Sequence, residues 1–158
     1  MNRGVGSRTW QAALVGGLLC LGSELAGAQA ASTVTVSGSP AAMSITSATA
    51  GFPPDFLTNA ITTYTAKAKQ ANRPQKITGQ LNAAMPVGMT LTVTLVATTG
   101  ATSDGTVTLD ATARELVGNI TNTANETHGI TYVLSATAAA GVVLSQSRTV
   151  TFTITAWP

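Results

Sequence analysis

The sequence contains stretches in which threonine and apolar residues alternate at every second position. From 89 to 97 the odd positions carry methionine, leucine, valine, leucine and alanine, and threonine occupies positions 90, 92 and 94. From 149 to 156 threonines alternate with valine, phenylalanine, isoleucine and alanine. Because successive side chains of a strand point to opposite faces of a sheet, each stretch has one apolar and one hydroxyl face. The pattern predicts strands that are buried on one face only.

Weaker alternation predicts further strands, separated by turn-forming residues such as Gly38-Ser39-Pro40 and Ser103-Asp104-Gly105. About seven to eight short strands at this spacing predict an all-β fold, an immunoglobulin-like antiparallel β-sandwich. The stretch 111–117 alternates poorly and contains good helix formers, so a short helical turn is expected there. The weaker strands are expected at 33–37, 60–68, 75–81, 106–110 and 130–138.

The first 30 residues have the features of a bacterial-type secretory signal peptide. Arg3 and Arg8 precede an apolar run at 10–21, which is followed by small residues. This run is shorter than the roughly 20 residues that a bilayer-spanning helix needs. The sequence therefore predicts a secreted, periplasmic or cell-surface protein with no membrane span after cleavage.

Cleavage is expected after Ala28 or Ala30, so residues 1–28 are assigned to the signal peptide and residues 29–158 to a single domain. The one cysteine, Cys20, lies in the apolar run. Because it is removed with that run, the processed chain is expected to form no disulfide and no thiolate metal site.

Few residues of the processed chain could catalyse a reaction. Charged residues make up 9% of the sequence, and the only histidine, His128, lies beside Glu126. The pair could be a base with its orienting carboxylate, or two metal ligands, but no further ligand is close in sequence. The alternative is a polar loop at 122–129 that leads into a strand. We expect no enzymatic activity, no cofactor and no metal site.

Four of the eight lysine and arginine residues lie in one short region of the sequence, at Lys67, Lys69, Arg73 and Lys76. This cluster is either a patch for an anionic ligand or the solvated end of a hairpin. Aromatic residues, which would stack on bases, make up only 4% of the chain. Nucleic acid is therefore not an expected partner.

The segment 31–37 is β-branched, alternates, and ends at Gly38. A strand of this kind next to a cleavage site has two possible fates. It pairs within its own sheet, or it inserts Val34 and Val36 into a neighbouring subunit by adding to an open sheet edge.

The order of segments resembles the major subunits of chaperone–usher fimbriae of the colonisation-factor type. The likeness is carried by STVTVS at 32–37, TYTAKAKQANRPQKITGQL at 63–81, TLDATARELVGNI at 108–120, TYVLSAT at 131–137 and RTVTFTIT at 148–155. The resemblance implies a cysteine-free, immunoglobulin-like sandwich that polymerises by donor-strand exchange and is assisted by a periplasmic chaperone. It also implies a donor strand and an acceptor groove, formed respectively by Thr33, Val34, Thr35 and Val36 and by Val150, Phe152 and Ile154.

These features predict an exported structural or adhesive protein, a fimbria-like or surface-assembly subunit that associates through strand edges. Its expected partners are copies of itself or another surface protein. The alternative is a secreted carbohydrate- or protein-binding accessory domain, for which Trp157 would be the aromatic platform.

Overall fold

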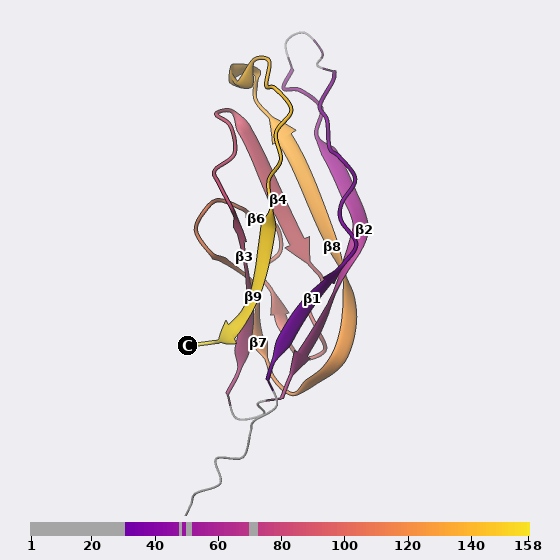
Figure 1. The fold of residues 1–158 in the computed structure, drawn as a ribbon, viewed down its shortest axis with the longest axis vertical. Coiled ribbons are helices and arrows are strands. Elements are labelled where there is room, and N and C mark those ends of the chain that lie inside the picture. The colour runs from indigo at the N-terminus through magenta and orange to yellow at the C-terminus, as the bar shows by residue number, and fades with distance from the viewer. Residues whose placement is uncertain (1–30, 48, 50–51, 70–72) are drawn as a thin grey trace, which may run out of the picture.

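The computed structural model describes residues 31–47, 49, 52–69 and 73–158. The predicted signal peptide and Cys20 lie outside these residues. Within the described residues the chain forms two antiparallel sheets packed face to face, which confirms the all-β sandwich (Figure 1). Its elements are β1 (Thr33–Ser37), β2 (Leu57–Ala68), β3 (Gln75–Leu81), β4 (Met89–Leu95), β5 (Thr102–Ser103), β6 (Val107–Thr108), β7 (Arg114–Ile120), β8 (Thr123–Ala136), the 3₁₀ turn η1 (Ala138–Ala140) and β9 (Val150–Ala156).

The two sheets are built by a chain that changes sheet at almost every connection. The five-stranded sheet has the order β1-β2-β8-β4-β6, and the four-stranded sheet has the order β5-β7-β3-β9. From β3 onward each strand lies in the sheet opposite to that of the preceding strand. Connections between sheets of this kind are characteristic of immunoglobulin-like sandwiches.

The predicted division between an apolar and a hydroxyl face is present in both sheets. The hydroxyls of Thr65 and Thr127 lie 2.7 Å apart on neighbouring strands, and those of Thr94 and Thr106 lie 3.0 Å apart. The opposite faces meet in one core, because a pleated strand sends alternate side chains inward. The largest fully buried side chains of this core include Tyr64, Ile77, Leu81, Leu95, Leu116, Ile120 and Ile130.

The helical turn expected at 111–117 is wrong, because most of this stretch belongs to strand β7. Leu116, Val117 and Gly118 are buried one after another. The pairing of β7 with β3 is irregular here, and Asn119 adopts a left-handed backbone with φ of 53°. An irregularity of this kind, a β-bulge, interrupts the two-residue period, which explains why the sequence pattern did not indicate a strand.

The loop expected at 122–129 is also wrong, because β8 begins at Thr123. Its pairing with β2 shifts register between Ala66 and Ala68, and Asn125 has φ of 51°. Asparagine tolerates this left-handed conformation better than other non-glycine residues. This second bulge interrupts the two-residue alternation in the first half of β8, so the sequence pattern did not predict a strand there.

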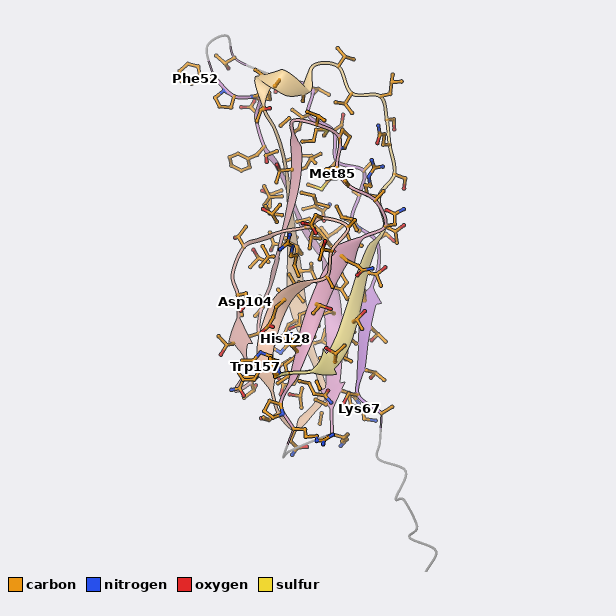
Figure 2. All side chains as sticks on the ribbon, turned by 90° about the vertical axis from the view of Figure 1, so that its left-hand side faces the viewer. Phe52, Lys67, Met85, Asp104, His128 and Trp157 are labelled. Atoms are coloured by element: carbon orange, nitrogen blue, oxygen red, sulfur yellow. The ribbon has the colours of Figure 1, made fainter. Side chains whose placement is uncertain are left out.

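Residues 38–47 and 52–56 and the loops 82–88 and 137–149 meet at one end of the sandwich (Figure 1, top). We call this the loop end. The start of β1, the end of β2, the start of β3 and the end of β9 lie at the opposite end. The side-chain view agrees, with Phe52 and Met85 toward the loop end and His128, Trp157 and Lys67 toward the other (Figure 2).

Candidate functional site

One side of the sandwich is bounded by two edge strands from different sheets. Among residues 31–47, 49, 52–69 and 73–158, β9 pairs with β3 alone, and β1 pairs with β2 alone. The two edge strands contact each other without sharing a sheet (Figure 1). We call the boundary between β1 and β9 the edge seam. Because each edge strand has a single partner, the seam presents backbone groups that a further strand could pair with.

Apolar side chains from both strands line the edge seam. On β9, Val150, Phe152 and Ile154 are partly buried and pack against the core. On β1, Val34 does the same, and Val36 is 41% exposed. The structure thus brings the two predicted sets of residues together, Thr33, Val34, Thr35 and Val36 on β1 and Val150, Phe152 and Ile154 on β9.

Of the two fates predicted for β1, the single chain shows pairing within its own sheet. Its register with β2 places Thr35 opposite Thr65 and Val36 opposite Tyr64. No side chain of β1 is fully buried, whereas β2 is also held by β8 on its other edge. Release of β1 would therefore cost little core packing and would leave β2 paired.

A half-open cavity of about 710 Å³ lies at the loop end. Its lining includes Met43, Met85 and Met89, three of the four methionines of the chain. The extended segments 41–47 and 142–148 form part of its wall. This cavity was not predicted from the sequence. The one sequence feature that could have indicated it is that Met43, Met85 and Met89 all lie in or beside loops.

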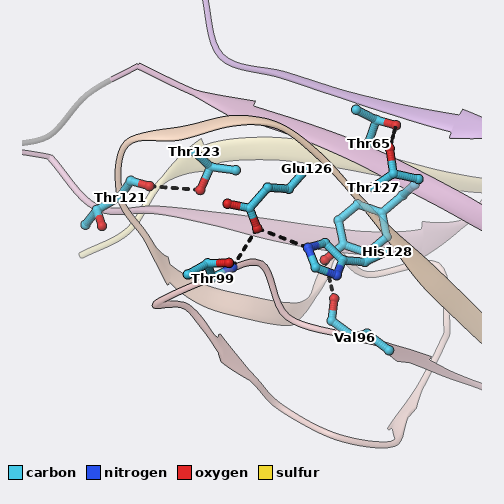
Figure 3. A network of polar contacts seen from close by, with 9 residues as sticks. Thr65, Val96, Thr99, Thr121, Thr123, Glu126, Thr127 and His128 are labelled. Atoms are coloured by element: carbon cyan, nitrogen blue, oxygen red, sulfur yellow. Dashed lines mark hydrogen bonds and ion pairs between the residues drawn. The ribbon is translucent and has the colours of Figure 1, made fainter.

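His128 and Glu126 contact each other on β8, and Glu126 also fastens the loop after β4 to this strand (Figure 3). His128 Nε2 lies 3.1 Å from Glu126 Oε2, which also accepts a hydrogen bond of 2.8 Å from the backbone N–H of Thr99. The Thr99 N–H, followed by the His128 side chain, lowers the pKa of the Glu126 carboxyl. This carboxylate is therefore engaged by two donors, and its observed role is to position the loop after β4.

Tyr64 lies beneath this contact, with its ring centroid 6.0 Å from that of His128. Its side chain is fully buried, and its hydroxyl donates a hydrogen bond to the backbone oxygen of Val96. Burial, with a smaller contribution from the charge of Glu126, raises the pKa of Tyr64 to about 12.

Trp157 is held by both of its N–H groups, one bonded to β7 and the other to the residue before β3. The indole N–H donates to Glu115 Oε1 at 2.7 Å, and the backbone N–H donates to the oxygen of Pro74 at 2.8 Å. Glu115 also forms an ion pair with Lys76 at 3.1 Å. Trp157 is 38% exposed. The N–H edge of its indole, the predicted platform, is bonded to Glu115 within the domain.

Replacement of Gly118 by alanine is expected to displace this indole, because the added Cβ would lie 2.6 Å from Glu115 Oε1 and 3.0 Å from Trp157 Nε1. Loss of the hydrogen bond should lower the free energy of unfolding by roughly 1–2 kcal/mol. In the fragment 31–158, Trp157 is the only tryptophan, so its fluorescence emission should shift to longer wavelength. Gly129→Ala is the control, because nothing lies within 4 Å of its added Cβ. Unchanged emission in Gly118→Ala would contradict the contact.

The predicted cation cluster is spread over the end opposite to the loop end. Lys76 is paired with Glu115, and Lys69 and Arg73 are exposed. In the part of the chain that the structure describes, no three His, Cys, Asp or Glu side chains gather as metal ligands would. No helix in that part is long and apolar enough to cross a bilayer.

The chain matches no protein-family model, no curated protein and no solved structure.

Proposed function

We propose that this protein is an exported structural subunit that assembles by strand addition at the edge seam. The observation that carries the proposal is the pair of edge strands, β1 and β9, each with a single strand partner in the described chain. In the assembly, β1 of one copy leaves β2 and pairs with the open edge of β9 in another copy. An exposed sheet edge with unpaired backbone groups is a template for pairing with a strand of another chain.

The side chains of the edge seam support this mode of association. An incoming strand pairs its backbone with β9 and places alternate side chains beside Phe152 and Ile154, which are only partly buried in the single chain. In β1, Val34 is partly buried against the core, Val36 lies on the same face of the strand and is 41% exposed, and Thr33 and Thr35 lie on the opposite face. The donor therefore carries the two-residue pattern that a half-buried strand requires.

The energetic balance favours association at high protein concentration. Within one chain β1 has a high effective concentration next to β2, which opposes its release. Exchange replaces the pairing of β1 with β2 by pairing of β1 with β9 of another copy. It covers the open edge of β9 and exposes the edge of β2. Because no side chain of β1 is fully buried, association has to overcome only a small packing energy of the intramolecular state.

The test is the mass of the fragment 31–158 as a function of concentration, measured by sedimentation velocity. The wild-type fragment is expected to form concentration-dependent oligomers, and deletion of residues 31–37 should abolish them. The variant Val34→Lys/Val36→Lys should also remain monomeric, because it places charges on the inward face of the donor.

Thr33→Lys/Thr35→Lys is the matched control, because it adds the same charges to the outward face of the same strand. This variant should assemble like the wild type. A wild-type fragment that stays monomeric at all concentrations would contradict the proposal, as would equal loss of assembly in both lysine variants.

A further inference from the structure

The cavity at the loop end is half open to solvent and is lined by both apolar and polar residues. Met43, Met85 and Met89 line it together with Leu134. All three methionines are partly buried and pack on the core. Its volume of about 710 Å³ lies within the range of roughly 300–1,000 Å³ that is typical of small-molecule sites. Methionine side chains are flexible and polarizable, so they adapt to apolar ligands of different shape.

At the rim of the cavity two apolar side chains, Phe52 and Leu144, are 70% and 81% exposed. The lining also includes polar side chains such as Thr46 and Gln146. A ligand with a long apolar chain could enter along the rim and bury its length against the methionines.

Among the described residues that line the cavity, Arg148 is the only ionisable one. Its guanidinium donates to the backbone oxygens of Ala84 and Ser147 and to the side-chain oxygen of Gln146, at 3.0, 2.9 and 2.6 Å. All three acceptors are neutral, and no carboxylate of the described residues forms an ion pair with this arginine. Because a guanidinium has five N–H donors, it has both the charge and the donors to bind an anion.

We propose that the cavity binds a single-chain anionic amphiphile of the fatty-acid class. The carboxylate pairs with Arg148, and the acyl chain lies along Met43, Met85 and Met89. A charge-assisted hydrogen bond to the carboxylate fixes the orientation of the ligand, and burial of methylene groups supplies most of the affinity. This activity is separate from assembly, because it uses the loop end and requires neither β1 nor the outer edge of β9.

The experiment is calorimetric titration of the fragment 31–158 with dodecanoate, decanoate, dodecanol and dodecyltrimethylammonium, each below its micelle concentration. Dodecanoate is expected to bind with one molecule per chain. Removal of each methylene should weaken binding by roughly fourfold. Arg148→Gln should weaken dodecanoate binding by about tenfold without changing dodecanol binding, whereas Arg148→Lys should retain the preference for the anion.

Arg73→Gln is the matched control, because Arg73 is an exposed arginine at the opposite end of the sandwich. It should bind dodecanoate like the wild type. The assembly-deficient variant Val34→Lys/Val36→Lys should also bind it normally, so that failure of assembly and failure of ligand binding are distinguished. The proposal is overturned if dodecanoate does not bind, if the cationic amphiphile binds equally well, or if Arg148→Gln leaves dodecanoate binding unchanged.

Discussion

Replacement of Gly88 by alanine is expected to destabilise the domain by about 3 kcal/mol, the largest effect that we predict for a single methyl group. Gly88 has φ of +78°, a left-handed conformation that alanine adopts at a cost of about 1 kcal/mol. The added Cβ would also lie 2.7 Å from the backbone nitrogen of Ala140 and 2.8 Å from its Cα. These are backbone atoms of η1, so the contact cannot be relieved by rotation of a side chain.

The control is Gly38→Ala, because Gly38 has a nearly identical φ of +77° and nothing within 4 Å of its added Cβ. In Gly38→Ala the free energy of unfolding should fall by only about 1 kcal/mol, which is the cost of the left-handed backbone. Urea unfolding of the two variants measures the difference directly. Equal destabilisation of the two variants would show that the close contact between the 82–88 loop and η1 does not contribute to the effect of Gly88→Ala.

The second large effect is expected at alkaline pH, and it depends on Tyr64. An unfolded tyrosine has a pKa near 10, whereas burial raises the pKa of Tyr64 in the folded protein to about 12. The folded state therefore holds this proton more tightly. The contribution of this bound proton to the free energy of unfolding is fully present below pH 10 and is lost as the pH rises through 12. By proton linkage, the difference between the folded and unfolded pKa of Tyr64 corresponds to about 3 kcal/mol in the free energy of unfolding.

The measurement is the free energy of unfolding of the wild type and of Tyr64→Phe at several pH values between 8 and 12. At pH 8 the variant should be less stable by about 1 kcal/mol, because it lacks the hydrogen bond to Val96. The difference should shrink and then reverse above pH 10, since phenylalanine does not titrate. Burial raises the pKa of Tyr132 as well, so the variant keeps part of the alkaline sensitivity. Parallel curves for the two proteins would contradict the assignment to Tyr64.

The strands that could be predicted from the sequence are those with an uninterrupted two-residue period. For β3, β4 and β9 the expected and observed ranges agree closely, because each of these strands buries one face throughout. Strand β7 and the first half of β8 were missed because bulges at Asn119 and Asn125 interrupt the period. A bulge depends on pairing with a strand far away in the chain, which a local pattern does not contain.

The candidate sites differ in how far the sequence could indicate them. The residues of the edge seam were predicted because β1 and β9 have clear alternation. Their position along one side of the sandwich follows from the sheet order, which alternation does not determine. The cavity was missed because its wall contains the irregular segments 41–47 and 142–148. The sequence could not indicate Arg148 as a binding residue, because its position in the cavity depends on neighbours such as Ala84, 64 residues away in the chain.

The most direct test of assembly through the edge seam is to lock β1 onto its own sheet. Thr35 and Thr65 lie opposite each other on β1 and β2, and directly opposed residues of antiparallel strands have the spacing that a disulfide needs. The fragment 31–158 contains no cysteine, so Thr35→Cys/Thr65→Cys introduces a single possible intramolecular disulfide. Sedimentation velocity should show a monomer at every concentration when this variant is oxidised, and concentration-dependent oligomers when it is reduced. Equal assembly of the oxidised and reduced forms would contradict the exchange of β1 between copies.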